Sequence, residues 1–130
     1  GSALMYFVVP KIILFREEHS PRTLVKKVDF ISAPGTSPPN VYRPGGPKYL
    51  ITNKALFSFN QVEKKFKIEK INPEFSLEEV VKSTGFEFNA NNNLKYFTIP
   101  SKKRISIIRN LIVPKTLNFY PQFAKNTWKV

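Results

Sequence analysis

The sequence contains no cysteine and one histidine, His19. The absence of cysteine excludes disulfide bonds and thiolate metal sites, and one histidine alone cannot build a metal centre. No apolar run approaches the roughly 20 residues that a membrane-spanning helix needs, because the first apolar stretch stops at Pro10. The basic start and small-residue cleavage site of a secretion signal are also missing. We therefore expect a cytoplasmic protein with no metal ion and no membrane-spanning segment.

Acidic residues are scarce as well. Nine aspartates and glutamates stand against 21 lysines and arginines, which gives a net charge of +12. Residues 101–130 contain no acid. Such a balance permits binding to nucleic acid, to an anionic membrane or to phosphorylated ligands. The cations of this last segment are Lys102, Lys103, Arg104, Arg109, Lys115, Lys125 and Lys129.

Residues 25–35 are expected to organise the fold. Val28, Phe30 and Ile31 favour β-structure, and the proline and glycine that follow stop a strand. The sequence therefore predicts a short buried strand that ends in a long loop, residues 32–48. Many α/β proteins place a ligand site at the carboxyl edge of the sheet, which makes this loop the main candidate for ligand contact. Its glycines and prolines equally suit a purely structural crossover, and both interpretations remain open.

The segments before this stretch are also predicted as β-structure. Residues 4–9 and 11–16 favour one strand that is bent at Pro10. The continuous apolar run of residues 12–15 is typical of a strand that is buried on both faces, as in a parallel sheet covered by helices. These segments are expected to lead into the central strand.

An antiparallel hairpin and a short helix are predicted further along. Residues 48–53 and 55–60 favour strands, and residues 65–71 alternate apolar with polar side chains, which indicates a hairpin with one face in water. Ser76 with Glu79 three positions later is a capping box, and the apolar spacing that follows predicts a helix over residues 77–84.

The last part of the chain is predicted to hold a strand over residues 94–99 and a helix that Ser101 caps and Pro114 ends. Beyond Pro114, aromatic residues are interleaved with lysines. They could stack on bases and follow phosphates, or cover hydrophobic surface that a partner or a second copy would bury. These aromatic residues are Phe119, Tyr120, Phe123 and Trp128.

Five blocks along the chain share their order with a known family. Read together, they resemble the later part of the β subunit of class I coenzyme A transferases, of the glutaconate-CoA and 3-oxoacid-CoA type. Each block alone would be a weak signal, whereas the ordered set over about 100 residues is specific. The blocks are EHSPRT (18–23) with KVDFISAPG (27–35), GGPKYLITN (45–53) with LFSF (56–59), INPEFSLEEV (71–80), TGFEF (84–88) and IRNLIVP (108–114).

The resemblance implies an α/β fold with a mostly parallel sheet and an antiparallel hairpin, present as a partial domain over residues 1–114. Residues 115–130 extend beyond the family's usual end. The implied reaction is a ping-pong transfer in which a glutamate carboxylate becomes a glutamyl-CoA thioester. Coenzyme A is then a substrate, and no covalently bound cofactor is expected.

The family's nucleophilic glutamate and its glycine-rich oxyanion turn precede the part that this chain resembles. No glutamate here stands in a matching context, so no catalytic residue is assigned and the chain alone is predicted to be inactive. We expect it to act with a CoA-transferase α subunit, with a polypeptide that carries the first half of the β subunit, or with both, in a homo- or hetero-oligomer. The residues expected to border the acyl-CoA pocket are Ser32, Gly35, Arg43, Gly45 and Gly46, with Arg43 facing anionic groups.

Other interpretations stay open beside this one. His19 next to Arg22 favours a charged turn over a catalytic base, and Glu78 and Glu79 favour interactions with the helix N-terminus. A non-catalytic scaffold on the same fold would fold alone and lack affinity for CoA. A nucleic-acid-binding module, which we rank last, would lose affinity steeply with salt.

Overall fold

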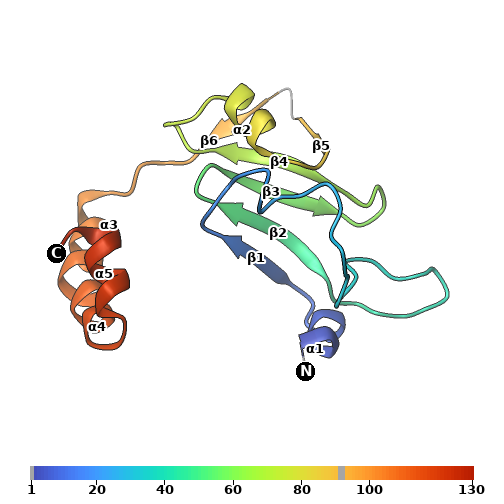
Figure 1. The fold of residues 1–130 in the computed structure, drawn as a ribbon, viewed down its shortest axis with the longest axis horizontal. Helices are drawn as coiled ribbons and strands as arrows, with labels where there is room; N and C mark the ends of the chain where they lie inside the picture. The colour runs from blue at the N-terminus through green and yellow to red at the C-terminus, as the bar shows by residue number, and fades with distance from the viewer. Residues whose placement is uncertain (1, 91–92) are drawn as a thin grey trace. The chain divides into compact units, whose positions relative to one another are not determined.

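A computed structural model describes residues 2–90 and 93–130. The chain divides into two compact units, the first ending at Phe97 and the second spanning Thr98–Val130. The first unit carries a β-sheet and the second is helical (Figure 1). The division at Phe97 falls inside the single domain that the sequence predicted over residues 1–114.

The described strands of the first unit form one mixed sheet. Its order is β1-β2-β3-β4-β5, and β6 also pairs with β4. The β1–β2, β4–β5 and β4–β6 pairings are parallel, whereas β2–β3 and β3–β4 are antiparallel. The predicted α/β class, with parallel pairing and an antiparallel hairpin, is confirmed. The strands are β1 (Ile12–Arg16), β2 (Pro47–Thr52), β3 (Ala55–Asn60), β4 (Lys65–Ile71), β5 (Phe88–Asn89) and β6 (Lys95–Tyr96).

The β3–β4 hairpin is held by its own turn chemistry. The Asn60 side-chain oxygen accepts hydrogen bonds from the backbone N–H groups of Val62 at 2.9 Å and Glu63 at 3.1 Å. Lys64 closes the turn with a φ of 54°, in the left-handed region. These local interactions explain why the alternating pattern of the sequence located this hairpin correctly.

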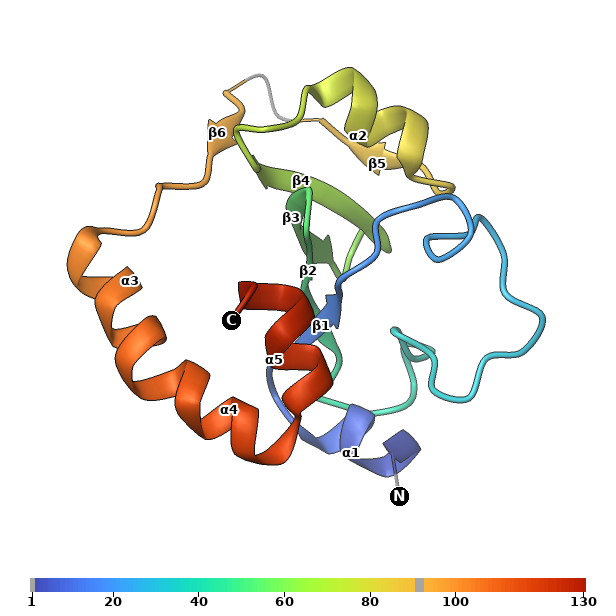
Figure 2. The same cartoon turned by 60° about the vertical axis from the view of Figure 1, so that its left-hand side comes forward.

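One face of the sheet carries the core. Phe57, Ile68 and Ile71 are fully buried there together with Val80 of the helix α2 (Leu77–Ser83). The Phe57 ring makes edge-to-face contacts with aromatic rings from β4 and from the segment after α2, the nearest with Phe88 at 5.2 Å between centroids. Figures 1 and 2 show α2 beside β4 and β5. The predicted helix and its capping box are confirmed.

The predicted central strand is absent. Residues 25–35 form an irregular loop, in which Phe30 is 81% exposed and Ile31 is 64% exposed. Strand preference depends on a neighbouring strand and a half-buried surface. Residues 25–35 pair with no described strand, and Phe30 and Ile31 rest on no half-buried surface, so this preference is not realised. The prediction of a buried strand in this segment was wrong.

The N-terminal predictions need a second correction. Ser2–Val8 is the helix α1, not a strand, and the helix stops before Pro10. Leucine, methionine and alanine in this stretch are good helix formers, and a proline ends a helix ahead of it. The following strand β1 was predicted to be buried on both faces, yet Ile13 and Phe15 are 59% and 73% exposed. β1 therefore has one open face.

The second unit is a set of consecutive helical segments. Ser101 caps α3 as predicted, because its hydroxyl accepts from the backbone N–H of Arg104. The predicted stop at Pro114 was wrong, because the chain continues through a π-helical turn into α4. Pro114 lies in the first turn of α4, where the backbone N–H group that proline lacks would have no partner within the helix. The segments are α3 (Lys102–Ile107), η1 (Ile108–Ile112), α4 (Val113–Phe119) and α5 (Pro121–Trp128).

The predicted extension, residues 115–130, lies within the helical hairpin that α4 and α5 form, which Figure 2 shows side by side. Val113 and Ala124 are its buried side chains, and the rings of Phe123 and Trp128 meet edge to face at 5.8 Å. No helix within the described part of the chain is long and apolar enough to cross a membrane.

Candidate functional site

The carboxyl ends of the parallel strands β1 and β2 meet at one edge of the sheet. The polar residues at and just after these ends line an open hollow of about 420 Å³. Its lining consists of Arg16, Glu17, Glu18 and Asn53. Within residues 2–90 and 93–130, no group of three or more His, Asp or Glu side chains could hold a metal ion. This edge offers charged and hydrogen-bonding groups.

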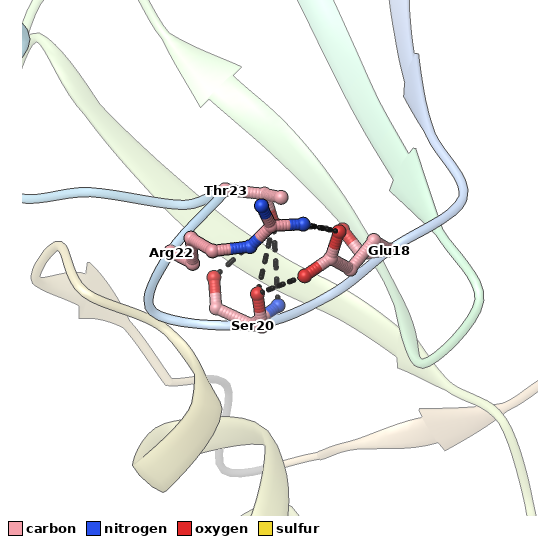
Figure 3. A network of polar contacts seen from close by, with 4 residues as sticks. All are labelled: Glu18, Ser20, Arg22 and Thr23. Atoms are coloured by element: carbon pink, nitrogen blue, oxygen red, sulfur yellow. Dashed lines mark hydrogen bonds and ion pairs between the residues drawn. The ribbon is translucent and has the colours of Figure 1, made fainter.

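A hydrogen-bond network fixes the turn behind this hollow (Figure 3). The Ser20 hydroxyl donates to Glu18 Oε1 at 2.7 Å, and Arg22 Nη2 donates to Glu18 Oε2 at 2.8 Å. The Thr23 hydroxyl donates to the Glu18 carbonyl at 2.9 Å. The hydrogen bond from Ser20, followed by that from Arg22, lowers the pKa of Glu18 below its ordinary value. Both carboxylate oxygens are thus engaged in ordering the turn.

His19, in the same turn, points into the protein. Its side chain is buried, with Nδ1 2.8 Å from Thr52 Oγ1 and Nε2 2.8 Å from Thr84 Oγ1. The Thr84 hydroxyl donates its single proton to the Val80 carbonyl at 2.7 Å, so it must accept from Nε2. Burial, aided by the charge of Lys54, lowers the pKa of His19 to about 4. The ring is neutral, with its proton on Nε2.

This arrangement corrects the sequence-based view of His19. The sequence favoured a charged turn, and the charge indeed lies on Glu18 and Arg22, but the histidine is an uncharged link between β2 and the end of α2. Its partners are 33 and 65 residues away. No local sequence signal could have identified them.

The five residues that the sequence assigned to ligand contact lie elsewhere. Three are glycines near the amino end of β2, the opposite end from the hollow. Gly46, with a φ of 138°, accepts from the N–H of Ile12 at 3.3 Å. The N–H of Gly45 donates to the Phe7 carbonyl at 2.8 Å, and a Cβ at Gly45 would lie 2.5 Å from that carbonyl. A Cβ at Gly35 would meet Pro47 at 3.4 Å.

The remaining two predicted contacts are more accessible. The Arg43 guanidinium lies over the Phe7 ring, 4.0 Å from its centroid, in a cation–π contact. Ser32 is exposed in the loop. The structure thus gives Gly45 and Gly46 a backbone-packing role, while ligand contact by Ser32, Gly35, Arg43, Gly45 and Gly46 stays a prediction.

Comparison with known proteins places this geometry in context. No protein-family model matches the chain. Over 104 residues, the chain is 27% identical to the β subunit of glutaconate CoA-transferase from Acidaminococcus fermentans; the match covers 75% of this chain and 39% of that subunit. The crystal structure of glutaconate coenzyme A-transferase from this organism matches with a TM-score of 0.74 and 25% identity, covering 89% of this chain and 46% of the other.

Two further structures share the fold. IpdAB of Rhodococcus jostii RHA1 matches with a TM-score of 0.72 and 21% identity over 82% of this chain and 45% of the other. The decarboxylase AibA/AibB matches with a TM-score of 0.63 and 21% identity over 84% and 41%. The chain therefore spans less than half the length of these relatives. The resemblance to a CoA-transferase β subunit is confirmed.

Proposed function

Because this chain is a homologue of part of the glutaconate CoA-transferase β subunit, we propose that it contributes to acyl-CoA transfer within such an enzyme. It acts only together with a partner that carries the nucleophilic glutamate. The observation that supports this most is the agreement of sequence and fold with one protein: 27% identity over 104 residues and a TM-score of 0.74.

The proposed reaction has two halves. A glutamate carboxylate attacks the thioester carbonyl of an acyl-CoA, and the CoA thiolate leaves. The thiolate then attacks the glutamyl carbonyl of the resulting anhydride, which releases the acyl group as a free carboxylate and leaves a glutamyl-CoA thioester. A second acid takes CoA by the reverse sequence, so coenzyme A is a substrate.

Three glutamates of this chain are held by other groups, which fits a nucleophile supplied from elsewhere. Glu18 is held by Ser20 and Arg22, and Glu79 caps α2. Glu69 accepts a hydrogen bond from the Ser58 hydroxyl at 2.6 Å. Carboxylates committed to such interactions order the fold and are poorly available for attack. None of the glutamates matches the sequence context of the family's nucleophile.

The proposed substrate contacts come from the loop before β2. Arg43, which is exposed and lies over the Phe7 ring, would face an anionic group of CoA or of the acid. Ser32 would offer a hydroxyl, and Gly35, Gly45 and Gly46 would allow close approach to the backbone. The loop would then combine a packing role with a binding role.

Assembly with other polypeptides is the second part of the proposal. The relatives are heteromeric: the curated relative is one subunit of its enzyme, and the names IpdAB and AibA/AibB each denote two components. The partners proposed for this chain are an α subunit of a CoA-transferase, a polypeptide corresponding to the rest of the β subunit, or both. The complex is proposed to work in the cytoplasm.

Reconstitution tests the proposal. The chain is co-expressed with the α subunit of the Acidaminococcus enzyme and with the portion of its β subunit that this chain does not match. CoA transfer from an acyl-CoA to a free acid is then measured. The matched portion of the relative's own β subunit serves as positive control, and each component alone serves as negative control.

We expect transfer with the complete set and none with this chain alone. Transfer by the purified chain alone would contradict the proposal. The proposal would also be contradicted by a complex that shows no CoA transfer although native mass spectrometry finds this chain in it. The positive control, with the relative's own portion, must be active under the same conditions.

A further inference from the structure

The strand β1 is the open edge of the sheet in the first unit. It pairs with β2 on one side and with no other described strand (Figure 1). Among the described residues, no backbone group of residues 13–16 bonds outside the β1–β2 ladder. The side chains of Ile13 and Phe15, on the same face of this strand, are 59% and 73% exposed. An apolar edge of this kind is a template for another strand.

We propose that the β1 strands of two copies of this chain pair antiparallel across a two-fold axis, so that the two sheets become one. We assign the pairing strand to a second copy because the apolar and charged residues of β1 are arranged so that the strand complements itself. The inference goes beyond the proposed function and does not depend on it.

The register follows from the symmetry of the strand. β1 spans Ile12–Arg16 and is centred on Leu14. Pairing along its full length places Leu14 opposite the second copy's Leu14 and Ile13 opposite the second copy's Phe15. Directly opposed side chains on one face of an antiparallel pair are neighbours, so the two exposed apolar residues of each copy cover those of the other.

Charge complementarity supports the same register. Lys11 and Glu17, both exposed, flank the strand at equal distances from Leu14. Lys11 of each copy therefore lies opposite the second copy's Glu17, which gives two ion pairs for each dimer. A slip of two residues in either direction would instead place Phe15 opposite Lys11 or Ile13 opposite Glu17. Pro10 has no N–H group, so it ends the pairing beyond Lys11.

Sedimentation equilibrium of the full chain tests this assembly. The monomer has a mass of 15.0 kDa, and we expect a species of twice that mass. Phe15→Lys should raise the dimer dissociation constant about a hundredfold or more, because it puts two charges into the apolar contact. The side chain is exposed in the monomer, so far-UV circular dichroism should stay unchanged. Phe119→Lys, at an aromatic residue of the second unit that is 78% exposed, is the matched control and should leave the dimer intact.

A charge exchange tests the register. Lys11→Glu and Glu17→Lys should each raise the dissociation constant about tenfold, because each places like charges opposite one another twice. The double variant K11E/E17K should return to within about threefold of the original value. Rescue of this kind is specific to a register in which these two residues oppose one another.

Three results would overturn the proposal. The first is a monomer at the highest soluble concentration. The second is a dimer that survives Phe15→Lys but is lost in Phe119→Lys, which would move the interface to the second unit. The third is a monomer that instead binds the rest of the β subunit in the reconstituted complex, with that binding lost in Phe15→Lys. That result would assign the edge to a companion chain.

Discussion

His19 Nδ1 and Thr52 Oγ1 lie 2.8 Å apart in the interior of the first unit. The Thr52 hydroxyl already accepts from the backbone N–H groups of Lys54 and Ala55, so its proton can go to Nδ1 at 2.8 Å or to the Ala55 carbonyl at 3.2 Å. The shorter contact, with the histidine proton on Nε2, favours donation to Nδ1 and a neutral ring. The pKa of His19 is lowered to about 4, whereas an unfolded chain has a histidine pKa near 6.5. Below about pH 6.5, the unfolded state therefore binds a proton that the folded state does not.

The stability of the protein should consequently fall as the pH drops from about 6.5 towards 4. The expected loss between pH 7 and pH 5 is about 2 kcal/mol in the free energy of unfolding. Urea unfolding at the two pH values measures it. His19→Gln should be less stable at pH 7 and lose little more at pH 5, because this is the single histidine in the chain. Equal stability of the original protein at both pH values would refute the neutral, buried assignment.

Two phenylalanines with opposite exposure give a second prediction. Phe57 is fully buried and Phe30 is 81% exposed. Phe57→Ala should reduce the free energy of unfolding by about 3–5 kcal/mol, since it empties the centre of the aromatic cluster. Phe30→Ala, the matched control, should change it by no more than about 0.5 kcal/mol. A cost at Phe30 as large as that at Phe57 would show that residues 25–35 are buried after all.

A third prediction separates packing from binding in the glycine-rich loop. In Gly45→Ala the new Cβ would lie 2.5 Å from the Phe7 carbonyl, so α1 or the loop must shift. We expect a loss of about 1–3 kcal/mol in the free energy of unfolding. Gly35→Ala, whose Cβ would meet Pro47 at 3.4 Å, is the control and should be nearly neutral. Unchanged stability in Gly45→Ala would contradict the packing role of this glycine.

Arg43 gives a prediction for the assembled enzyme. In the reconstituted complex, Arg43→Gln should raise the KM for acyl-CoA about tenfold, which corresponds to about 1.4 kcal/mol, and leave kcat unchanged. Lys103→Gln removes an exposed charge from the second unit and is the control. If both variants leave KM unchanged, Arg43 only stacks on Phe7.

Local patterns in the sequence located the elements that local interactions stabilise. The β3–β4 hairpin has its alternating side chains and its Asn60 turn, and α2 has the Ser76–Glu79 capping box. Both were predicted within a residue or two. The order of the five sequence blocks likewise predicted the relationship to CoA-transferases, which the similarity to the glutaconate CoA-transferase subunit confirms.

Elements that depend on distant contacts were missed. Phe30 and Ile31 have a strong strand preference but no neighbouring strand, so they remain in a loop. The role of His19 depends on hydroxyl groups 33 and 65 residues away. None of these contacts is encoded in the residues that neighbour them in sequence.

The most direct test of the central claim is to locate the covalent intermediate. The reconstituted complex of this chain, the α subunit of the relative and the remainder of its β subunit is incubated with an acyl-CoA, and the intact mass of each polypeptide is measured. We predict a CoA adduct on the remainder of the β subunit, present only when this chain is in the complex, and no adduct on this chain. A CoA adduct on a glutamate of this chain, or an adduct that forms equally well without it, would contradict the account.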